Sequence, residues 1–377
     1  MSSIDEVFAT FHEIAASPKA RFDDYLSQGR KVVGCLPEYT PDELIHSMGL
    51  VPFGVWGADR IATKSARYLP SFYCGLLQTT LDLGISGGYE GLSAVVIPNL
   101  CDQLNAMGQN WKYAVPDVPF VPMNYPQNRA TPAGREFTRA SYPRVIEALQ
   151  QITGATFTEE ALQLSLDLYN THNDLMRRFS AAAAANPHIV TPSRRSDVFK
   201  SAHFMTPEEH NPLVSQLLSL LHAGSDENDD STIPIVTTGI LADAPDLLSV
   251  LGREGFRIVG DDVAHESRQY RIDAVQGETP LDKLVDKFAH MGNCSLLFDP
   301  GKGRAQNLVD LVEQRHAKGV VFVMTKFCDP EEFDYVPVKA TLDEKGIPSV
   351  SIEVDRQMDR LDQAEIALET FRDLLGV

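Results

Sequence analysis

The residues of this sequence whose chemistry depends most on their placement are its cysteines. There are five in 377 residues: Cys35, Cys74, Cys101, Cys294 and Cys328. An odd number scattered through a long chain argues against a disulfide framework. No C-x-x-C pair occurs, which disfavours zinc, whereas an iron-sulfur cluster is held by cysteine thiolates that can be dispersed in the sequence. A catalytic cysteine would need a histidine partner. Most single cysteines are small buried residues without a catalytic or ligand role. The spacing leaves these interpretations open.

Three of the cysteines follow apolar runs that are typical of buried strands. Cys35 comes after "KVVG", Cys101 after "SAVVIPNL" and Cys328 after "VVFVMTKF". Because ligands of open α/β sheets bind outside the carboxyl ends of the strands, we expect these thiols to face a crevice. Cys74 lies near the start of a predicted helix, where backbone N–H groups favour a thiolate. Cys294 begins the predicted strand "CSLLFD" at its amino end, and we expect it in or near the core.

The elements that must position these cysteines alternate between strand and helix. Continuous apolar strands separated by helices of 3.6-residue periodicity indicate parallel sheets covered on both faces. The sequence therefore predicts an α/β protein with two doubly wound, mostly parallel-sheet halves and a helical segment between them. We place an N-terminal α/β domain at 1–138, the helical segment at 139–230 and a C-terminal α/β domain at 231–377, with the acidic connector "SDENDDS" before the last.

Composition and charge exclude several classes of protein. The chain is 43% hydrophobic and 23% charged, which is a globular composition, and it has no run of about 18 apolar residues that could span a membrane. The formal net charge of −19 argues against binding to nucleic acid or to an anionic membrane. The acidic, amphipathic start "MSSIDEVFATFHEIAASPKARFDDYL" is unlike a secretory signal, so we expect a cytoplasmic protein. Without G-x-G-x-x-G or Walker A motifs, ATP or dinucleotide binding by those devices is not expected.

One charged segment, "DDVAHESRQYR", is a further candidate for function. It contains Asp261, Asp262, His265, Glu266, Arg268 and Arg271. Glu266 and Arg268 are weak candidates for catalytic residues. The segment is either a polar network at a crevice mouth or subunit interface, or a solvated loop whose local ion pairs contribute about 0–1 kcal/mol each.

Several stretches taken together resemble the smaller, β-type subunit (component D) of the 2-hydroxyacyl-CoA dehydratases, a family related to ATP-dependent benzoyl-CoA reductases. They are "IPNLCDQLNAMGQNWK", "YPQNR", "TPSRRSDVFKS", "TGILAD", "DDVAHESRQYRID" and "KFCDPEEFDY". The resemblance covers nearly the whole chain. It implies a heterodimer with a homologous α-type subunit, and an ATP-dependent iron-sulfur activator protein as the electron source.

The resemblance also implies a cofactor and its ligands. Cys74, Cys101 and Cys328 match the family positions that hold a [4Fe-4S] cluster, and Cys35 is either a substitute for one of them or a neighbour. Arg194, Arg195 and Lys200 form a basic patch that could meet CoA phosphates or an acidic partner, although ordinary helix-start charge is the commoner explanation. Trp111 is expected to be a packing residue. Flavin content stays open.

The reaction implied is the anaerobic, radical dehydration of a 2-hydroxyacyl-CoA to a 2-enoyl-CoA. One electron added to the thioester carbonyl gives a ketyl, which expels the hydroxyl and makes the β-proton acidic; the electron is then returned. The substrate is expected mainly in the α-type subunit, and this subunit relays or holds the electron. The rival interpretations are a subunit of a benzoyl-CoA reductase-like enzyme and a non-catalytic, two-lobed small-molecule-binding protein whose cysteines would be dispensable.

Overall fold

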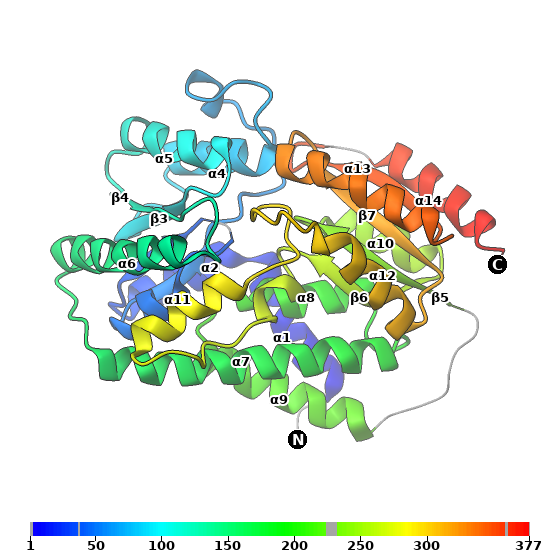
Figure 1. Ribbon diagram of the computed structural model, residues 1–377, viewed down its shortest axis with the longest axis horizontal. Helices are drawn as coiled ribbons and strands as arrows, with labels where there is room; N and C mark the ends of the chain where they lie inside the picture. The colour runs from blue at the N-terminus through cyan, green and yellow to red at the C-terminus, as the bar shows by residue number, and fades with distance from the viewer. Residues whose placement is uncertain (1–2, 37, 224–231, 359–360, 377) are drawn as a thin grey trace.

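Two four-stranded sheets, each wholly parallel, organise the chain (Figure 1). The computed structural model describes residues 3–36, 38–223, 232–358 and 361–376. We call the part built on the first sheet the first lobe and the part built on the second sheet the second lobe. Across the described ranges, no helix combines the length and apolarity needed to cross a membrane. The predicted fold class, two parallel α/β halves with helices between them, is confirmed.

The first sheet has the strand order β2-β1-β3-β4. Its strands are β1 (Val32–Cys35), β2 (Val51–Gly54), β3 (Ala94–Pro98) and β4 (Phe120–Met123). Helices α2 (Pro18–Ser27), α4 (Gly75–Ile85) and α5 (Asp102–Ala114) pack on one face. The other face is covered by α3 (Asp42–Ser47), α6 (Pro132–Thr153) and α11 (Pro280–His290). The inner strands are apolar because both of their faces are buried, as the continuous apolar runs predict.

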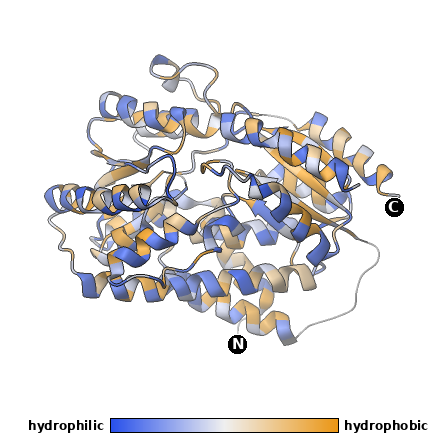
Figure 2. Cartoon of the chain, viewed as in Figure 1, coloured by the Kyte–Doolittle hydropathy of each residue, from blue (hydrophilic) through white to orange (hydrophobic). Residues whose placement is uncertain are grey.

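The second sheet repeats this arrangement with the order β6-β5-β7-β8. Its strands are β5 (Ile233–Gly239), β6 (Phe256–Val263), β7 (Gly319–Thr325) and β8 (Ser349–Val354). Helices α10 (Pro245–Arg253) and α14 (Asp362–Leu374) lie on one face. Helices α12 (Gly303–Arg315) and α13 (Asp329–Glu344) lie on the other. Figure 2 shows the strands in the hydrophobic colour between helices whose outer surfaces are largely hydrophilic.

A layer of long helices joins the lobes along one side of the molecule (Figure 1). It consists of α7 (Glu159–Ala185), α8 (Pro192–Ala202), α9 (Pro207–Ala223) and the N-terminal α1 (Ile4–Ala16). Two short 3-10 helices, η1 (Ser65–Arg67) and η2 (Ser267–Tyr270), complete the elements. Helix α11 follows the second lobe's strand β6 in sequence but packs against α6 and α7, so the chain crosses between the lobes. The predicted connector "SDENDDS" lies outside the described residues.

One predicted strand is wrong. The residues of "NCSLLFD" form turns, in which the Leu297 N–H donates to the Cys294 carbonyl at 3.1 Å, and Asn293 has a left-handed φ of 54°. The stretch is apolar because its leucines are packed between elements of the first lobe and α11. An apolar run of this length indicates burial, but it does not show whether a partner strand lies beside it.

In each sheet the order of the strands changes direction at one place. The chain passes from β1 to β2 on one side and then to β3 on the other side, and β5, β6 and β7 repeat this pattern. Such switch points open a crevice at the carboxyl ends of the strands, where ligands of this class of sheet bind. Cys35 ends β1, while Cys101 and Cys328 each follow β3 or β7 by three residues. The predicted placement of these three cysteines at the carboxyl ends of strands is therefore confirmed, but Cys35 does not share a cluster with the other two.

Candidate functional site

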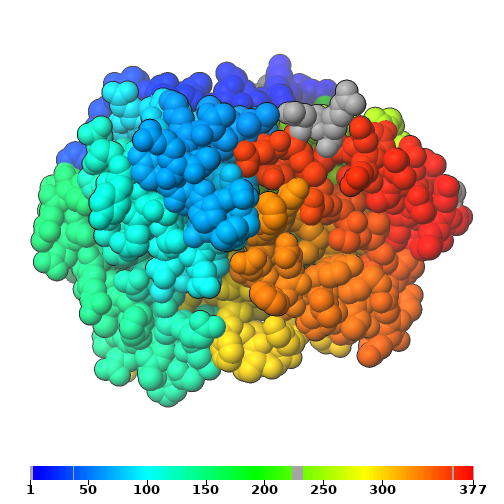
Figure 3. Space-filling view, turned by 90° about the horizontal axis from the view of Figure 1, so that it is seen from above, coloured from blue at the N-terminus to red at the C-terminus, as the bar shows by residue number. Residues whose placement is uncertain are grey.

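Three cysteines occupy the same local position, the N-cap of a helix. Cys74 caps α4, Cys101 caps α5 and Cys328 caps α13. The first two belong to the first lobe and the third to the second lobe. In Figure 1 the N-terminal ends of α4 and α13 face each other, and in Figure 3 the segments that carry them meet at the boundary between the lobes. We call Cys74, Cys101 and Cys328 the thiol triad.

The members of the thiol triad are neighbours in space. All three belong to, or pack against, one apolar cluster of the first lobe. Burial is the main reason that their pKa values are raised, to about 12 for Cys74 and well above the usual value for Cys328. The other two thiols raise the pKa of Cys328 further, because like charges repel at short range. The three neighbouring thiols are therefore held neutral until something cationic is present.

Helix N-termini oppose this effect at each thiol. The backbone N–H groups of Leu77, Leu104 and Glu331 each lie three residues after a cysteine and lower its pKa. At Cys101 the Leu104 N–H donates to the sulfur at 3.4 Å. The Leu77 and Glu331 N–H groups donate to the Cys74 and Cys328 carbonyls at 3.1 and 3.0 Å, and the N-terminal end of each helix favours negative charge on a nearby sulfur.

One side chain connects the backbones of the triad. Gln103, two residues after Cys101, accepts a hydrogen bond from the Cys74 N–H at 2.9 Å and donates to the Phe327 carbonyl at 2.8 Å. Phe327 directly precedes Cys328 and has a left-handed φ of 62°, an uncommon conformation for a bulky residue. Gln103 thus joins the two lobes at the triad. The spacing of the cysteines in the sequence does not indicate this role of Gln103.

The chemistry of these donors fits an iron-sulfur cluster better than a single metal ion. Among the described residues, no three His, Cys, Asp or Glu side chains are arranged around a common point in the way a single ion requires. Thiolates on one zinc ion lie 2.3 Å from it and hence about 4 Å apart, whereas a cluster spreads its thiolate ligands over several iron atoms. Three thiols at three helix N-termini supply soft donors together with N–H groups that favour negative sulfur.

The remaining two cysteines lie elsewhere. Cys35 faces the opposite side of the first sheet, in the apolar cluster that contains α3 and α11, and its thiol contacts the Asp42 carboxyl. Cys294 is buried and its sulfur accepts a hydrogen bond from Arg268 at 3.3 Å, so its predicted place in the core is confirmed. Neither thiol is among the charges that shift the pKa values of the triad.

The segment "DDVAHESRQYR" is a buried ion-pair network, so its interpretation as a solvated loop is wrong. Glu266 pairs with Arg195, and Arg268 pairs with Asp262. Arg304 bridges Asp262 to Glu331 in the first turn of α13. The network therefore holds the first turn of the helix that Cys328 caps. Among the described residues, neither Glu266 nor Arg268 lines a cavity that has the size of a small-molecule site.

The predicted basic patch is also wrong. Arg195 is buried between Asp261 and Glu266, while Arg194 pairs with Asp5 and Lys200 with Asp243. The three cations lie on one helix but point to separate acidic partners, because a helix rotates neighbouring residues by about 100°. Trp111 is fully buried and its Nε1 donates to the Val118 carbonyl, as expected for a packing residue.

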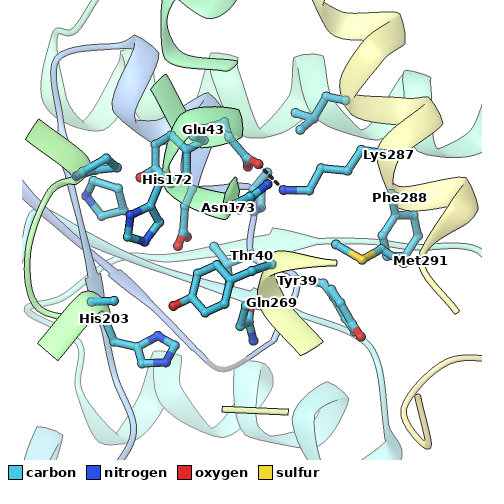
Figure 4. A pocket seen from close by; sticks show the side chains of 18 of the residues that line it. Tyr39, Thr40, Glu43, His172, Asn173, His203, Gln269, Lys287, Phe288 and Met291 are labelled. Atoms are coloured by element: carbon cyan, nitrogen blue, oxygen red, sulfur yellow. Dashed lines mark hydrogen bonds and ion pairs between the residues drawn. The ribbon is translucent and has the colours of Figure 1, made fainter. Parts of the chain in front are cut away.

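A second feature of the site region is a cavity between the first lobe and the layer of long helices. It is enclosed by α3, α7, α11, η2 and the loop after β1, and it is rich in tyrosines. Figure 4 shows Tyr39 and Gln269 at its centre, with Lys287 on α11 paired to Glu43 on α3. The sequence does not indicate this cavity, because its lining comes from eight stretches that are far apart along the chain.

The fold has two parallel-sheet lobes, and three N-cap cysteines meet at the boundary between them. These features are typical of proteins that bind a cofactor through thiolates. Comparison with known families makes the assignment specific. The profile described as 2-hydroxyglutaryl-CoA dehydratase, D-component, matches residues 37–375, and the chain belongs to this family.

Individual relatives agree with the family. The chain is 43% identical to the (R)-phenyllactyl-CoA dehydratase beta subunit of Clostridium sporogenes over 100% of both chains. It is 36% identical to the lactoyl-CoA dehydratase subunit beta of Anaerotignum propionicum, again over 100% of both. A more distant relative is a benzoyl-CoA reductase subunit of Thauera aromatica, at 24% identity over 91% of this chain and 90% of that one. The resemblance inferred from the sequence motifs is confirmed.

Proposed function

We propose that this chain is the β-type subunit of a 2-hydroxyacyl-CoA dehydratase and that it holds a [4Fe-4S] cluster through Cys74, Cys101 and Cys328. Its function is to hold and relay a low-potential electron for the dehydration of a 2-hydroxyacyl-CoA to a 2-enoyl-CoA. The observation that carries the proposal is the meeting of three N-cap thiols, drawn from both lobes, at one apolar cluster.

The residues around the triad have definite parts in this proposal. The three sulfurs bind the cluster, and the N–H groups of Leu77, Leu104 and Glu331 stabilise the negative charge on them. Gln103 holds the backbone at Cys74 and the backbone next to Cys328 at a fixed distance through its two hydrogen bonds. The apolar packing around Cys74 limits access of water. When bound, the cluster supplies one-electron chemistry, and burial and hydrogen bonding set its potential.

The proposed assembly has two partners. One is a homologous α-type subunit, in which the substrate mainly lies, and the other is an ATP-dependent iron-sulfur activator that delivers the electron. The names of the dehydratase relatives, each a beta subunit, support a partner subunit. The lower identity to the benzoyl-CoA reductase relative favours dehydration over ring reduction. The cytoplasmic location expected from the sequence stays a prediction, which cell fractionation would check.

The decisive experiment is anaerobic co-purification of the full chain with its partner subunit, followed by iron and sulfide analysis. About four irons for each copy of this chain, with a broad visible absorbance, are expected from a [4Fe-4S] cluster. Subtracting the iron of the partner requires a parallel preparation in which only this chain carries the change Cys101→Ser. A pair of subunits with no iron on this chain after anaerobic handling would overturn the proposal.

Single variants identify the ligands. Cys74→Ser, Cys101→Ser and Cys328→Ser should each lower the iron content of this chain. Cys35→Ser and Cys294→Ser are the matched controls, since both thiols are buried but lie away from the triad. If only Cys35→Ser removed iron, the ligand assignment would be wrong. Turnover is then measured with (R)-phenyllactyl-CoA, lactoyl-CoA and benzoyl-CoA as alternative substrates.

A further inference from the structure

The cavity beside the first lobe has two adjoining parts. The larger has a volume of about 90 Å³ and the smaller one of about 30 Å³. The residues that line both parts are Tyr39, Thr40, Asp42, His203 and Gln269. We call the two parts together the carboxyl cavity, because Glu38 and Asp42 line its smaller part. A water needs roughly 10–15 Å³ of such volume, so the smaller part has room for one small polar group and the larger part for several more atoms.

Two carboxyl groups of the smaller part have oxygens without a partner. Glu38 is only 4% exposed; its Oε1 accepts a hydrogen bond from Gln269 at 2.8 Å, but its Oε2 has no partner among the described residues. Asp42 lies beside the Cys35 thiol, and its Oδ1 is also buried and unpartnered among those residues. Buried polar atoms without partners are rare in folded proteins, so each of them indicates a ligand or a water.

The loop after β1 holds Glu38 at the cavity. Glu38 and Tyr39 have left-handed φ angles of 58° and 57°, which are uncommon for residues other than glycine. The Tyr39 carbonyl accepts a hydrogen bond from the Tyr125 hydroxyl at 2.7 Å, and Gln269 donates to the Glu38 carboxyl. Backbone angles of this kind cost stability and persist only where the surroundings enforce them. The Glu38 carboxyl is therefore kept in the smaller part and does not turn to solvent.

The positive charges near these carboxyls are paired with other acids. Within the described lining, Lys287 is the one side chain that is always cationic near neutral pH, and it pairs with Glu43. Arg268 and Arg271 lie outside the lining, and each pairs with Asp262. The cavity thus contains two acids for which the described residues provide no cation of their own.

Neighbouring groups add an acceptor and aromatic rings. Burial lowers the pKa of His203 to about 4, so its ring is neutral, and its Nε2 donates to the His265 carbonyl at 2.9 Å. The Nδ1 of the same ring is then an acceptor. The rings of Tyr39, Tyr169 and Tyr270 line the larger part, and aromatic faces attract ammonium groups. Acceptors beside aromatic rings are complementary to a cation that carries N–H donors.

We propose that the carboxyl cavity binds a small primary amine, whose ammonium group lies in the smaller part and donates hydrogen bonds to Glu38 and Asp42. The rest of the amine extends into the larger part. A metal ion fits less well, because no three His, Cys, Asp or Glu side chains of the described residues surround a common point. The site goes beyond the proposed function, since the thiol triad is not part of its lining.

Binding of an ammonium group must displace protons. Burial raises the pKa of Glu38 to about 8 and that of Asp42 to about 7, and the cation binds the ionised form of each. Amine binding should therefore weaken as the pH falls below these values. Burial lowers the pKa values of His172 and His203 to about 4, so neither histidine titrates near neutral pH. The titratable or charged groups that act on the two acids or share their lining are Cys35, Tyr39, Glu43, Tyr169, His172, His203, Arg268, Tyr270, Arg271 and Lys287.

The test uses the full chain, purified anaerobically with its partner subunit, and 2-aminoethanol as the probe. Ethylene glycol has a hydroxyl in place of the ammonium group and is the neutral control, while glycolate is the anionic control. Binding is measured at pH 8 by calorimetry and by ligand-observed NMR. We expect the amine to bind at least tenfold more tightly than either control. Equal binding of the three would overturn the proposal, because water alone would then satisfy the two carboxyls.

Proton release provides an independent test. Calorimetry at pH 7 in two buffers with different enthalpies of ionisation counts the protons that leave on binding. We expect about one proton, because at this pH the Glu38 carboxyl is mostly protonated and the Asp42 carboxyl about half protonated. The affinity should rise at least tenfold from pH 6 to pH 8, a range in which 2-aminoethanol stays protonated. An affinity that is constant over this range would contradict the proposal.

Simple ions separate an amine site from a site for any small cation. Potassium ion resembles ammonium ion in charge and size but donates no hydrogen bond. Displacement of 2-aminoethanol by ammonium chloride, with a much weaker effect of potassium chloride, supports a site that requires N–H donors. Equal displacement by the two salts would overturn this requirement. Tighter binding of ammonium ion than of 2-aminoethanol would show that the larger part does not hold the rest of an amine.

Variants place the probe in the cavity. Glu38→Gln and Asp42→Asn keep the shape of each side chain but remove its charge, so each should weaken amine binding at least tenfold and reduce proton release. Asp286→Asn is the matched control, because Asp286 lies on α11 outside the lining and pairs with Arg135. It should bind the amine as wild type does. Wild-type binding in both lining variants would overturn the proposal. If Asp42→Asn failed to fold, Glu38→Gln and the proton count would still decide.

The outcome is separable from that of the proposed function. Cys101→Ser should lose iron yet bind the amine as wild type does. An iron-replete protein that binds no amine would overturn this inference alone. Wild-type protein that binds the amine but holds no iron on this chain after anaerobic handling would overturn the proposed function alone.

Discussion

The Oε1 atom of Gln103 accepts a hydrogen bond from the backbone N–H of Cys74 at 2.9 Å. Because the Nε2 of the same side chain donates to the Phe327 carbonyl, one amide group satisfies a donor in the first lobe and an acceptor in the second. Asn and Gln carry an uncharged donor and acceptor side by side at every ordinary pH, and Gln has the longer reach. The relative position of two triad cysteines therefore depends on this one side chain.

Replacing Gln103 should loosen the triad. Gln103→Leu removes both hydrogen bonds and leaves two buried backbone groups unpaired, at a cost of about 1–3 kcal/mol each. We expect faster release of iron to a chelator and a lower free energy of unfolding in urea. Gln103→Glu can still accept from Cys74 but, when ionised, cannot donate to Phe327, so its defect should be smaller at low pH. Wild-type iron release in both variants would contradict the positioning role.

Gly75, the first residue of α4, lies against the second lobe. A Cβ built on it would be 1.7 Å from the Asp355 Oδ1, so Gly75→Ala must displace that carboxyl or the start of the helix. We expect a loss of about 1–3 kcal/mol in stability, typical of overpacking, and reduced iron content. Gly252→Ala is the matched control, because nothing lies within 4 Å of a Cβ there. That substitution in α10 should be neutral or stabilising by about 1 kcal/mol.

Two adjacent arginines should differ sharply in their effect on stability. Arg195 is 2% exposed and pairs with Asp261 and Glu266, so Arg195→Met leaves two buried acids without their cation. A loss of about 3–5 kcal/mol is expected, as for other broken buried pairs. Arg194→Met removes a surface pair with Asp5 and should cost no more than about 1 kcal/mol. Equal effects of the two changes on urea unfolding would show that the network is not buried as described.

Glu38 should make stability fall as the pH rises. Burial raises its pKa to about 8 in the folded chain, against about 4.3 in an unfolded one. An acid with a raised folded pKa contributes its full stability below the unfolded value, and this contribution is lost as pH rises through the folded value. The comparison with Glu38→Gln isolates this group, since all other titrations are shared.

The difference in unfolding free energy between Glu38→Gln and wild type should therefore grow in favour of the variant from pH 5 to pH 8. Each unit of pKa difference corresponds to about 1.4 kcal/mol. Urea titrations at four pH values in this window measure the slope. A difference that stays constant across the window would mean that Glu38 is not buried as a neutral acid.

The sequence contained enough information for the sheets and for the cysteines at their ends. Runs such as "SAVVIPNL" are buried on both faces, and their apolar continuity is a local property that can be read directly. The run "NCSLLFD" carries the same signal but lacks a neighbouring strand, and the presence of a neighbour is a non-local property. Burial of Arg195 was equally invisible, since its partners Asp261 and Glu266 are more than 60 residues away.

The candidate site shows the same difference between local properties, which the sequence reveals, and non-local ones, which it does not. Position relative to a strand predicted that Cys101 and Cys328 would emerge at a crevice, whereas Cys35, which ends β1, faces the other side of the sheet. Neighbouring residues of a strand point to opposite faces of the sheet. In a strand that is buried on both faces, every residue is apolar, so the sequence does not show which face a given residue points to. The cavity lined by Tyr39, His172 and Lys287 depends on helix α11 packing against the first lobe, which no local pattern indicates.

The distribution of the triad over two sheets has a mechanical consequence. Cys74 and Cys101 move with one lobe and Cys328 with the other, so any group that binds all three is also a clamp between them. Its binding free energy is then added to the docking of the lobes, in the same way that a ligand specific for the native state stabilises that state. Removal of such a clamp would open a hinge between two intact sheets before either sheet unfolds.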